Sequence, residues 1–342
     1  MTQQRIAVLG AGANGASIGA DLEARGLDVV LIEQWPAHVE RMRAEGLHIL
    51  SPDGDLHVHP RTLHLCEVAT LRTRFDVVLM LMKAYDSAWA AQLIEPYLAA
   101  DGLIVGLQNG MTIGAITGAV GAERTMGAVI EVSSTMDEPG IVHRHTGVSQ
   151  SWFAVGAPPG GPVGREEEIA TLLRHSGTVA IVDDIAAAKW MKLVSNSTLL
   201  VTSAILGLPM LDALHTPGMR DVMLHAGQEA LAVGQAIGHP ILPIFGLSAG
   251  EVSDPGRVVE IMLEKLFAGF VVPGATTTVL QDWGKSRRSE AMDLNGHVVA
   301  EGANHRIPTP MNSTVVDIAR RIERGDLVPD PAHLALMANA TH

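Results

Sequence analysis

The sequence has 342 residues, 47% of them hydrophobic, and a mean hydropathy of +0.23, which is enough to build the cores of two domains and excludes a largely disordered chain. Its 37 acidic residues outnumber its 24 basic residues, so the formal net charge is −13. This balance argues against nucleic acid or an anionic membrane surface as the main partner.

Cysteine content and hydropathy indicate the compartment. The single cysteine, Cys66, excludes an internal disulfide and fits a reducing cytosol. A lone thiol is more often a small buried residue than a nucleophile, so we expect Cys66 in the core. No apolar run approaches the roughly 20 residues of a membrane span. We therefore expect a cytoplasmic protein.

Two kinds of pattern divide the chain near residue 184. Before it, strand-like runs alternate with helical patterns, which is typical of a mostly parallel sheet wound with helices. These runs are RIAVLG, DVVLIE, FDVVLMLM, GLIVGLQNG, TMGAVIEVS, SWFAVG and TVAIVDD. After it, long amphipathic stretches are separated by Gly and Pro. The sequence predicts an α/β protein with a Rossmann-type doubly wound dinucleotide-binding domain over residues 1–184, an all-helical substrate and dimerisation domain over 185–330, and a tail over 331–342.

A glycine motif follows the first strand-like run. Gly10, Gly12 and Gly15 form G-x-G-x-x-G and open a helical pattern that ends at Gly26. The first glycine permits a tight turn, the second lets the backbone approach a pyrophosphate, and the third allows close helix–strand packing, while the helix N-terminus presents N–H groups to the anion. We predict a dinucleotide site that includes Asn14. The alternative is a βαβ unit without a ligand.

An acidic residue ends the second strand-like run. Glu33 lies 23 residues after Gly10, where a carboxylate can accept hydrogen bonds from ribose hydroxyls and repel a 2′-phosphate. The following QWPAH offers no arginine for that phosphate, the nearest being Arg41. This pattern favours NAD, with NADP possible if Glu33 points to solvent and other residues bind the phosphate.

Polar residues follow two later strand-like runs. Lys83 comes after DVVLMLM and Asn109 after GLIVGLQ. Ligands of open α/β sheets bind at the carboxyl ends of strands. A cation and an amide there can hold the nicotinamide side of a cofactor and an anionic substrate. The alternative is that both are ordinary loop residues.

The stretch KWMKLVSNSTLL is apolar but contains two lysines and an asparagine. On a helix, Lys189, Lys192 and Asn196 share one face, with Leu200 next along it. Either this face lies in water, or it faces a pocket in which a lysine is desolvated and made reactive.

Several motifs, in this order, resemble the ketopantoate reductase (2-dehydropantoate 2-reductase) family. They are the glycine loop, LMKAYDS, LQNGM, KWMKLVSN, TVLQDWGKSRRSEAMDLNGHVVAEG and IPTPMN, and the resemblance covers nearly the whole chain. It implies a Rossmann domain followed by a helical domain, and hydride transfer from a nicotinamide to the 2-oxo group of a branched 2-oxo acid.

The resemblance also implies residue roles. Lys192, two residues after a tryptophan, matches the general acid, and Lys189 becomes its neighbour. Asn196 and Thr278 match substrate-binding residues, and Glu290 matches the carboxylate that binds the substrate hydroxyl. Lys83 and Asn109 match the lysine and asparagine at the strand ends.

Simple chemistry agrees with these roles. Ketone reduction needs a hydride and a proton donor within hydrogen-bond reach of the carbonyl oxygen. A lysine donates more readily when partial burial and nearby cations lower its pKa. The apolar flanks of Lys192, together with Lys189, can supply both conditions.

Leu200 departs from the family, which commonly has a second asparagine there. An apolar residue tolerates an apolar substrate, so the alternative function is NAD-dependent oxidation of a bulkier or aromatic hydroxy acid or alcohol in catabolism. A non-catalytic NAD-sensing protein is a further alternative, but it would not need Lys192, Asn196 or Glu290.

The 15 histidines do not predict a metal site. His57 and His59 alternate on one predicted strand, and His143 and His145 on another, but no third ligand with zinc spacing accompanies either pair. The expected partners are a small-molecule substrate and a second copy of the chain.

Overall fold

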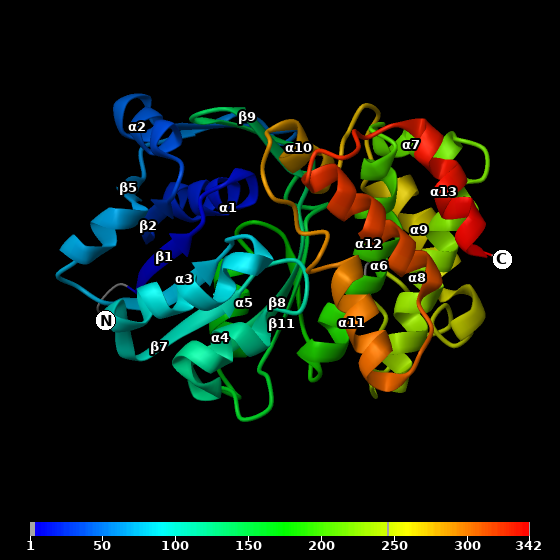
Figure 1. Ribbon diagram of the computed structural model, residues 1–342. Helices are drawn as coiled ribbons and strands as arrows, with labels where there is room; N and C mark the ends of the chain where they lie inside the picture. The colour runs from blue at the N-terminus through cyan, green and yellow to red at the C-terminus, as the bar shows by residue number, and fades with distance from the viewer. Residues whose placement is uncertain (1–3, 245, 342) are drawn as a thin grey trace. The chain divides into compact units, whose positions relative to one another are not determined.

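The computed structural model describes residues 4–244 and 246–341 of the chain. They belong to two compact units, residues 1–186 and 187–342 (Figure 1). The described strands all lie in the first unit, and the second is built from helices.

The main sheet of the first unit has eight strands in the order β12-β11-β8-β7-β6-β1-β2-β5. Neighbouring strands are parallel except β11 and β8, which are antiparallel. The strands are β1 (Arg5–Leu9), β2 (Asp28–Glu33), β5 (Arg61–His64), β6 (Phe75–Met80), β7 (Leu98–Gly106), β8 (Thr125–Glu131), β11 (Trp152–Gly156) and β12 (Thr178–Ile181). The predicted Rossmann-type sheet is confirmed, and β5 is added to it.

Helices cover both faces of this sheet, so its central strands are buried on both sides. In β1, Ile6 and Val8 join one core cluster while Ala7 and Leu9 join the other. Such continuous apolar runs are expected of buried parallel strands. Helices α1 and α5 contribute to the first cluster, and α3 and α4 to the second. The helices of this unit are α1 (Ala13–Ala24), α2 (Pro36–Glu45), α3 (Ser87–Ile94), α4 (Ile113–Val120) and α5 (Glu166–Leu173), with the short turns η1 (Leu65–Thr70), η2 (Ala84–Asp86), η3 (Glu95–Tyr97) and η4 (Ala122–Arg124).

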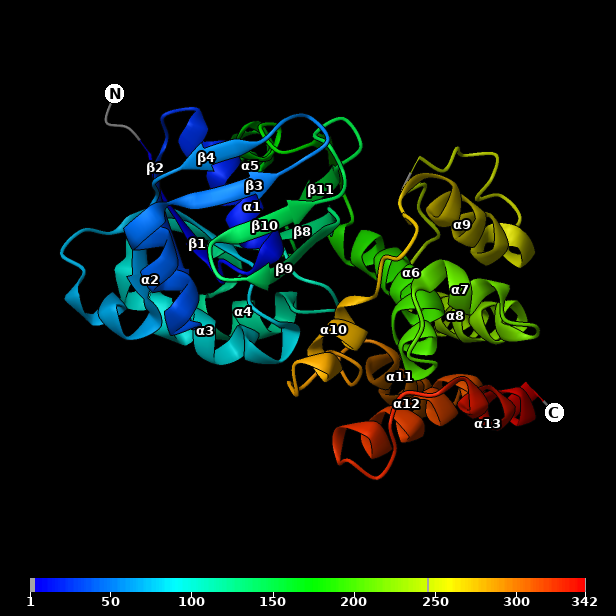
Figure 2. The same ribbon diagram turned by 90° about the horizontal axis from the view of Figure 1, so that it is seen from above.

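A second sheet, which the sequence patterns do not indicate as a sheet, packs against α1. Its order is β4-β3-β10-β9, with β3 (Leu47–Leu50), β4 (Leu56–Val58), β9 (Ser134–Glu138) and β10 (Ile141–Arg144) (Figure 2). Arg144 on β10 forms a buried ion pair with Asp21 on α1, at 2.6 Å between Nη1 and Oδ2. Burial raises the pKa of Asp21, and the field of Arg144 opposes that rise. This pair fastens the second sheet to the helix that follows the glycine motif.

The second unit confirms the predicted helical half. Its helices are α6 (Ile185–Ile205, which begins in the first unit), α7 (Met210–His215), α8 (Met219–Ala236), α9 (Pro255–Gly269), α10 (Thr278–Gly284), α11 (Asn295–His305), α12 (Pro310–Glu323) and α13 (Leu334–Ala338), with the turns η5 (Pro331–His333) and η6 (Asn339–Thr341). The indole of Trp190 on α6 donates to the carbonyl of Ala230 on α8, at 2.9 Å. A Cβ on Gly234 would lie 2.1 Å from the indole nitrogen, so α8 needs a glycine there to approach α6.

Two expectations about single segments differ from the structure. Cys66 is exposed, because η1 turns Val68 and not Cys66 into the core. The segment over residues 331–342, expected as a tail, contains α13, which buries Met337 and contacts α8 and α12.

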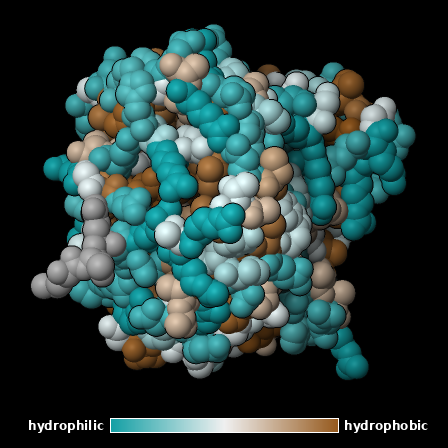
Figure 3. Space-filling model, turned by 90° about the vertical axis from the view of Figure 1, so that its left-hand side faces the viewer, coloured by the Kyte–Doolittle hydropathy of each residue, from teal (hydrophilic) through white to brown (hydrophobic). Residues whose placement is uncertain are grey.

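The surface in Figure 3 is mainly hydrophilic, with apolar residues scattered among polar ones. Among the helices of the described residues, none has both the length and the apolar character needed to cross a membrane.

Candidate active site

The three motif glycines have distinct surroundings. Gly10 has φ +94°, and a Cβ on it would lie 2.7 Å from the amide nitrogen of Met82. A Cβ on Gly15 would lie 2.0 Å from the carbonyl oxygen of Gly10. The tight turn and the close packing predicted for these two positions are therefore present. Gly12 differs, because a Cβ there would meet nothing within 4 Å.

Packing within the protein does not require a glycine at position 12, so the free space beside Gly12 is better explained by a ligand. Gly12 is the N-cap of α1, and no side chain caps this helix. Asn14, in the first turn, has a buried Oδ1 without a hydrogen-bond partner among the described residues. An uncapped helix N-terminus with an orphaned amide oxygen and open space beside its backbone can accept a phosphate and a ribose hydroxyl. The residues present thus fit a dinucleotide.

Glu33, the last residue of β2, is buried, with 6% of its surface exposed. Its Oε1 accepts a hydrogen bond from the backbone nitrogen of Trp35, at 2.9 Å. The alternative in which Glu33 points into solvent is wrong. A carboxylate at this position can accept hydrogen bonds from ribose hydroxyls and would repel a 2′-phosphate.

His38, which sequence reasoning did not single out, supports the glycine loop. The Gly140 nitrogen donates to His38 Nδ1 at 2.8 Å, so Nε2 carries the hydrogen that it donates to the carbonyl of Ala11 at 3.0 Å. Burial lowers the pKa of His38 to about 4. The imidazole is therefore neutral near pH 7 and is not a cation for a 2′-phosphate.

Lys83 and Asn109 follow the neighbouring strands β6 and β7, as expected. Gln108 connects the two strand ends, because its Nε2 donates to the carbonyl of Met82 and to Oγ of Ser87, both at 2.8 Å. Both Lys83 and Asn109 are half-buried. Sequence reasoning used LQNGM only for its asparagine and missed the glutamine that fixes the loop.

The polar face predicted for KWMKLVSNSTLL lies on α6. Lys189 is 3% exposed and Asn196 is 2% exposed, while Lys192 and Leu200 are half-buried. The interpretation of this face as a stripe in water is therefore wrong. Of the two lysines, Lys189, which was expected to be a mere neighbour, is the more deeply buried.

Burial lowers the pKa of Lys189 to about 7, and the field of Glu290 opposes this shift. Glu290 itself is 4% exposed. Two ionisable groups that are both buried are costly to desolvate, so the charge of Glu290 helps to keep Lys189 protonated. The sequence analysis placed the two residues in separate motifs, KWMKLVSN and TVLQDWGKSRRSEAMDLNGHVVAEG, and did not indicate their interaction.

Glu290 lies in the segment between α10 and α11, which is anchored by Ser289. The backbone nitrogen and Oγ of Ser289 donate to Oε1 of Glu323 at 3.0 and 2.6 Å. The carbonyl of Glu290 accepts from the backbone nitrogens of Asp293 and Leu294. These bonds fix the backbone on both sides of the carboxylate.

Thr278 is the first residue of α10, and Thr277 caps that helix by accepting from the nitrogen of Leu280. The Oγ1 of Thr278 is buried, and no hydrogen-bond partner for it is found among the described residues. A hydroxyl in this state has a donor and acceptors available for a ligand.

Asn295, also missed by the sequence analysis, ties α6 to α11 and α12. Its Nδ2 donates to the carbonyl of Ser197 at 3.0 Å and to Oδ1 of Asn312 at 2.8 Å. Asn312 in turn donates to Glu229, which also accepts from the first backbone nitrogens of α12. This buried network begins one residue after Asn196.

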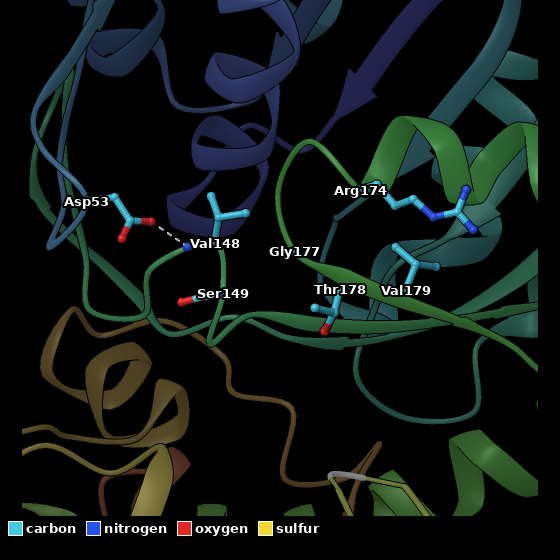
Figure 4. Close-up of a pocket in the computed structure, with 7 residues that line it drawn as sticks. All are labelled: Asp53, Val148, Ser149, Arg174, Gly177, Thr178 and Val179. Atoms are coloured by element: carbon cyan, nitrogen blue, oxygen red, sulfur yellow. Dashed lines mark hydrogen bonds between the residues drawn. The ribbon is translucent and has the colours of Figure 1, made fainter.

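An open surface hollow in the first unit is lined by none of the predicted site residues (Figure 4). Its charged groups already have partners, because Asp53 accepts from the nitrogen of Val148 at 2.6 Å and Arg174 pairs with Glu167 at 2.5 Å.

Three histidine rings lie next to one another in the first unit. The ring centroids of His48 and His57 are 3.8 Å apart, and those of His57 and His59 are 4.8 Å apart. Across residues 4–244 and 246–341, no group of three metal-ligating side chains is arranged to hold an ion.

The predicted residues thus form two clusters. In the first unit, backbone contacts connect Gly10 to β2 through Ile32 and to the Lys83 loop through Met82. In the second, Lys189 interacts with Glu290 and shares α6 with Lys192 and Asn196. Thr278 is not joined to this second cluster by a described side-chain hydrogen bond.

Comparison with known proteins gives two family models that match the chain. The model described as Ketopantoate reductase PanE/ApbA matches residues 6–160, and Ketopantoate reductase PanE/ApbA C terminal matches residues 184–323. A 2-dehydropantoate 2-reductase of Caulobacter vibrioides is 28% identical over 91% of this chain and 96% of its own length. One from Archaeoglobus fulgidus is 25% identical over 95% of this chain and 100% of its own length.

Solved structures agree with this fold. The PanE/ApbA family ketopantoate reductase from Ralstonia eutropha JMP134 has a TM-score of 0.79 and 26% identity, over 94% of this chain and 99% of its own. A D-mandelate dehydrogenase, solved with NADH and anilino(oxo)acetate, has a TM-score of 0.82 at 20% identity over 94% of this chain and 99% of its own, a likeness of fold.

Proposed function

The chain belongs to the ketopantoate reductase family of oxidoreductases, and we propose that it transfers a hydride between a nicotinamide cofactor and a 2-oxo acid or its 2-hydroxy partner. The observation that carries this proposal is the polar face of α6, where Lys189 and Asn196 are buried in an otherwise apolar helix and Glu290 acts on one of them. Buried ionisable groups are expensive, and they cluster at functional sites.

In the proposed reaction, Lys192 donates a proton to the oxygen that develops negative charge as the ketone is reduced, and its neutral amine takes that proton back in the reverse direction. Asn196 and Thr278 bind the substrate, and Glu290 orients it through a substrate hydroxyl. The orphaned Oγ1 of Thr278 supports such a contact. The nicotinamide, when bound, supplies the hydride.

In the first unit, the amides at the start of α1 bind the pyrophosphate, with Gly12 and Asn14 beside it. Glu33 accepts the ribose hydroxyls, and Lys83 and Asn109 bind the nicotinamide side and the substrate's negative charge. We propose NAD as the preferred cofactor, because Glu33 is anchored by Trp35 and His38 is neutral. Steady-state rates with NADH and NADPH test this preference, and a clear preference for NADPH would remove the role of Glu33.

The substitution Lys192→Met tests the proton donor. Turnover should fall by about 10²- to 10⁴-fold, while NADH binding measured by fluorescence stays close to that of the wild type. Lys265→Met is the matched control, since Lys265 pairs on the surface with Glu251 at 3.0 Å and its loss should leave turnover unchanged. Near-normal turnover of Lys192→Met would show that another group donates the proton.

Leu200 supports a second candidate, the oxidation of a bulkier or aromatic hydroxy acid. Its apolar side chain is half-buried on the same helix as Lys192 and Asn196. A panel of 2-oxo acids with small, branched and aromatic side chains separates the two candidates. The substitution Leu200→Asn should shift preference towards polar substrates if this residue contacts them.

We also propose that the protein forms a homodimer. Analytical sedimentation of the purified protein tests this proposal.

A further inference from the structure

Lys189 is a buried titratable group that the proposed reaction does not use. With 3% of its surface exposed, it lies one helical turn before Lys192 on the same face of α6. Glu290, with 4% exposed, approaches from the segment before α11 and is the charged group that acts on it. Neither group can be buried in its charged form without large cost unless the other compensates.

We infer that Lys189 is a positioning residue for Glu290, and that the charge of this pair decides how strongly an anionic 2-oxo acid binds beside α6. The inference rests on the proposed function only for the identity of the ligand. With Lys189 protonated, the pair is an ammonium and a carboxylate and carries no net charge. Once Lys189 loses its proton, the same buried pair carries one negative charge and repels the substrate carboxylate.

Other titratable groups also lie near this part of α6. Lys192 lies on the same helix and is half-buried. His297 on α11 and His239 after α8 pack against the indole of Trp190, with ring centroids at 5.7 and 5.3 Å. Burial lowers the pKa of His297, with Glu301 opposing the shift. The imidazole of His297 is therefore kept towards the neutral form, and Glu290 is the charged group that acts on Lys189.

The first experiment observes the proton directly and needs no substrate. The chain has five lysines, so ¹³C labelling of the lysine Cε gives five signals, which single Lys→Met variants assign. In the intact protein, the Lys189 signal should titrate near pH 7, where its pKa is about 7. In Glu290→Gln, the midpoint should move to lower pH, because the anion that favours the charged amine is gone. An unchanged midpoint would overturn the inference.

The second experiment measures KM and kcat of the wild type between pH 6 and 9. We expect KM for a 2-oxo acid to rise severalfold across the titration of Lys189, with a smaller change in kcat. The double variant Lys189→Met/Glu290→Gln removes both charges and should lose this rise, and Lys265→Met is the control that should keep it. A rise that persists in the double variant would also overturn the inference.

The two experiments separate this inference from the proposed function. If the protein has no 2-oxo acid reductase activity but the Lys189 midpoint still responds to Glu290→Gln, the pairing stands and the ligand is wrong. If turnover follows Lys192 as proposed but the Lys189 midpoint does not respond, the function stands and the pairing is wrong.

Discussion

The two clusters of predicted site residues consist of different kinds of chemical group. In the first unit, backbone atoms dominate: the glycine loop, an uncapped helix N-terminus, and the main-chain contacts that His38 and Gln108 make. In the second, buried side chains dominate, and the charge of Glu290 acts on the amine of Lys189. Backbone groups keep their partial charges at any pH, whereas side chains titrate. Changes in the first cluster should therefore act mainly on folding and cofactor affinity, and changes in the second on substrate binding and turnover.

The largest effect on stability is expected for Gly15→Ala. Its new Cβ would lie 2.0 Å from the carbonyl oxygen of Gly10, so α1 must move away from the loop. We expect a loss of about 3 kcal/mol in the free energy of unfolding, measured by urea denaturation, together with loss of NADH binding. Gly12→Ala is the matched control, because its Cβ meets nothing within 4 Å. It should keep the stability and weaken only cofactor binding, and equal stabilities of the two variants would contradict the comparison.

A smaller loss is expected for His38→Leu, which leaves the carbonyl of Ala11 and the amide of Gly140 without their partner. We expect about 2 kcal/mol and a weaker affinity for NADH.

The pH dependence of the free energy of unfolding provides the control for the His38→Leu prediction. Its pKa is lowered from 6.5 to about 4, so the unfolded chain binds more protons between these values. The contribution of His38 is therefore complete above pH 6.5 and is lost as the pH falls towards 4. The stability of His38→Leu should decline less over this range than that of the wild type, and parallel curves would contradict the assignment.

The smallest of these effects is expected for Ser289→Ala in the second unit. It removes the bond from Oγ to Glu323 at 2.6 Å and keeps the one from the backbone nitrogen. We expect a loss of about 1 kcal/mol in stability and a KM several times higher at nearly constant kcat, because the segment that carries Glu290 is held less firmly. Ser313→Ala, at an exposed position on α12, should change neither quantity. A large fall in kcat for Ser289→Ala would assign this segment to the chemical step instead.

Local patterns predicted much of this molecule. The apolar strands of the main sheet, the G-x-G-x-x-G turn and the helix of KWMKLVSNSTLL each depend on residues close together in sequence. The second sheet escaped prediction because its strands are short, and β10 pairs with β3 across about 90 residues of intervening chain. Strand pairing over such distances has no local signal.

Side-chain partners in the candidate site were harder to predict for the same reason. His38 meets Ala11 and Gly140, which lie 27 and 102 residues away. The spacing of Lys189 and Lys192 correctly placed both on one face, but which of them is more deeply buried depends on how α8 and α11 pack against α6. The family resemblance predicted a catalytic role for Lys192, whereas the packing of the helices buries Lys189 more deeply.

The contact between Trp190 and Gly234 has a consequence for how this sequence can vary. A glycine in the middle of a helix costs about 1 kcal/mol relative to alanine, and α8 carries that cost because the indole of α6 occupies the space of a side chain. Among homologues, we expect these two positions to covary, with a larger residue at 234 accepted only where 190 holds something smaller than tryptophan. For protein engineers, position 234 is thus an unsuitable place for the usual stabilising Gly→Ala exchange unless position 190 is redesigned with it.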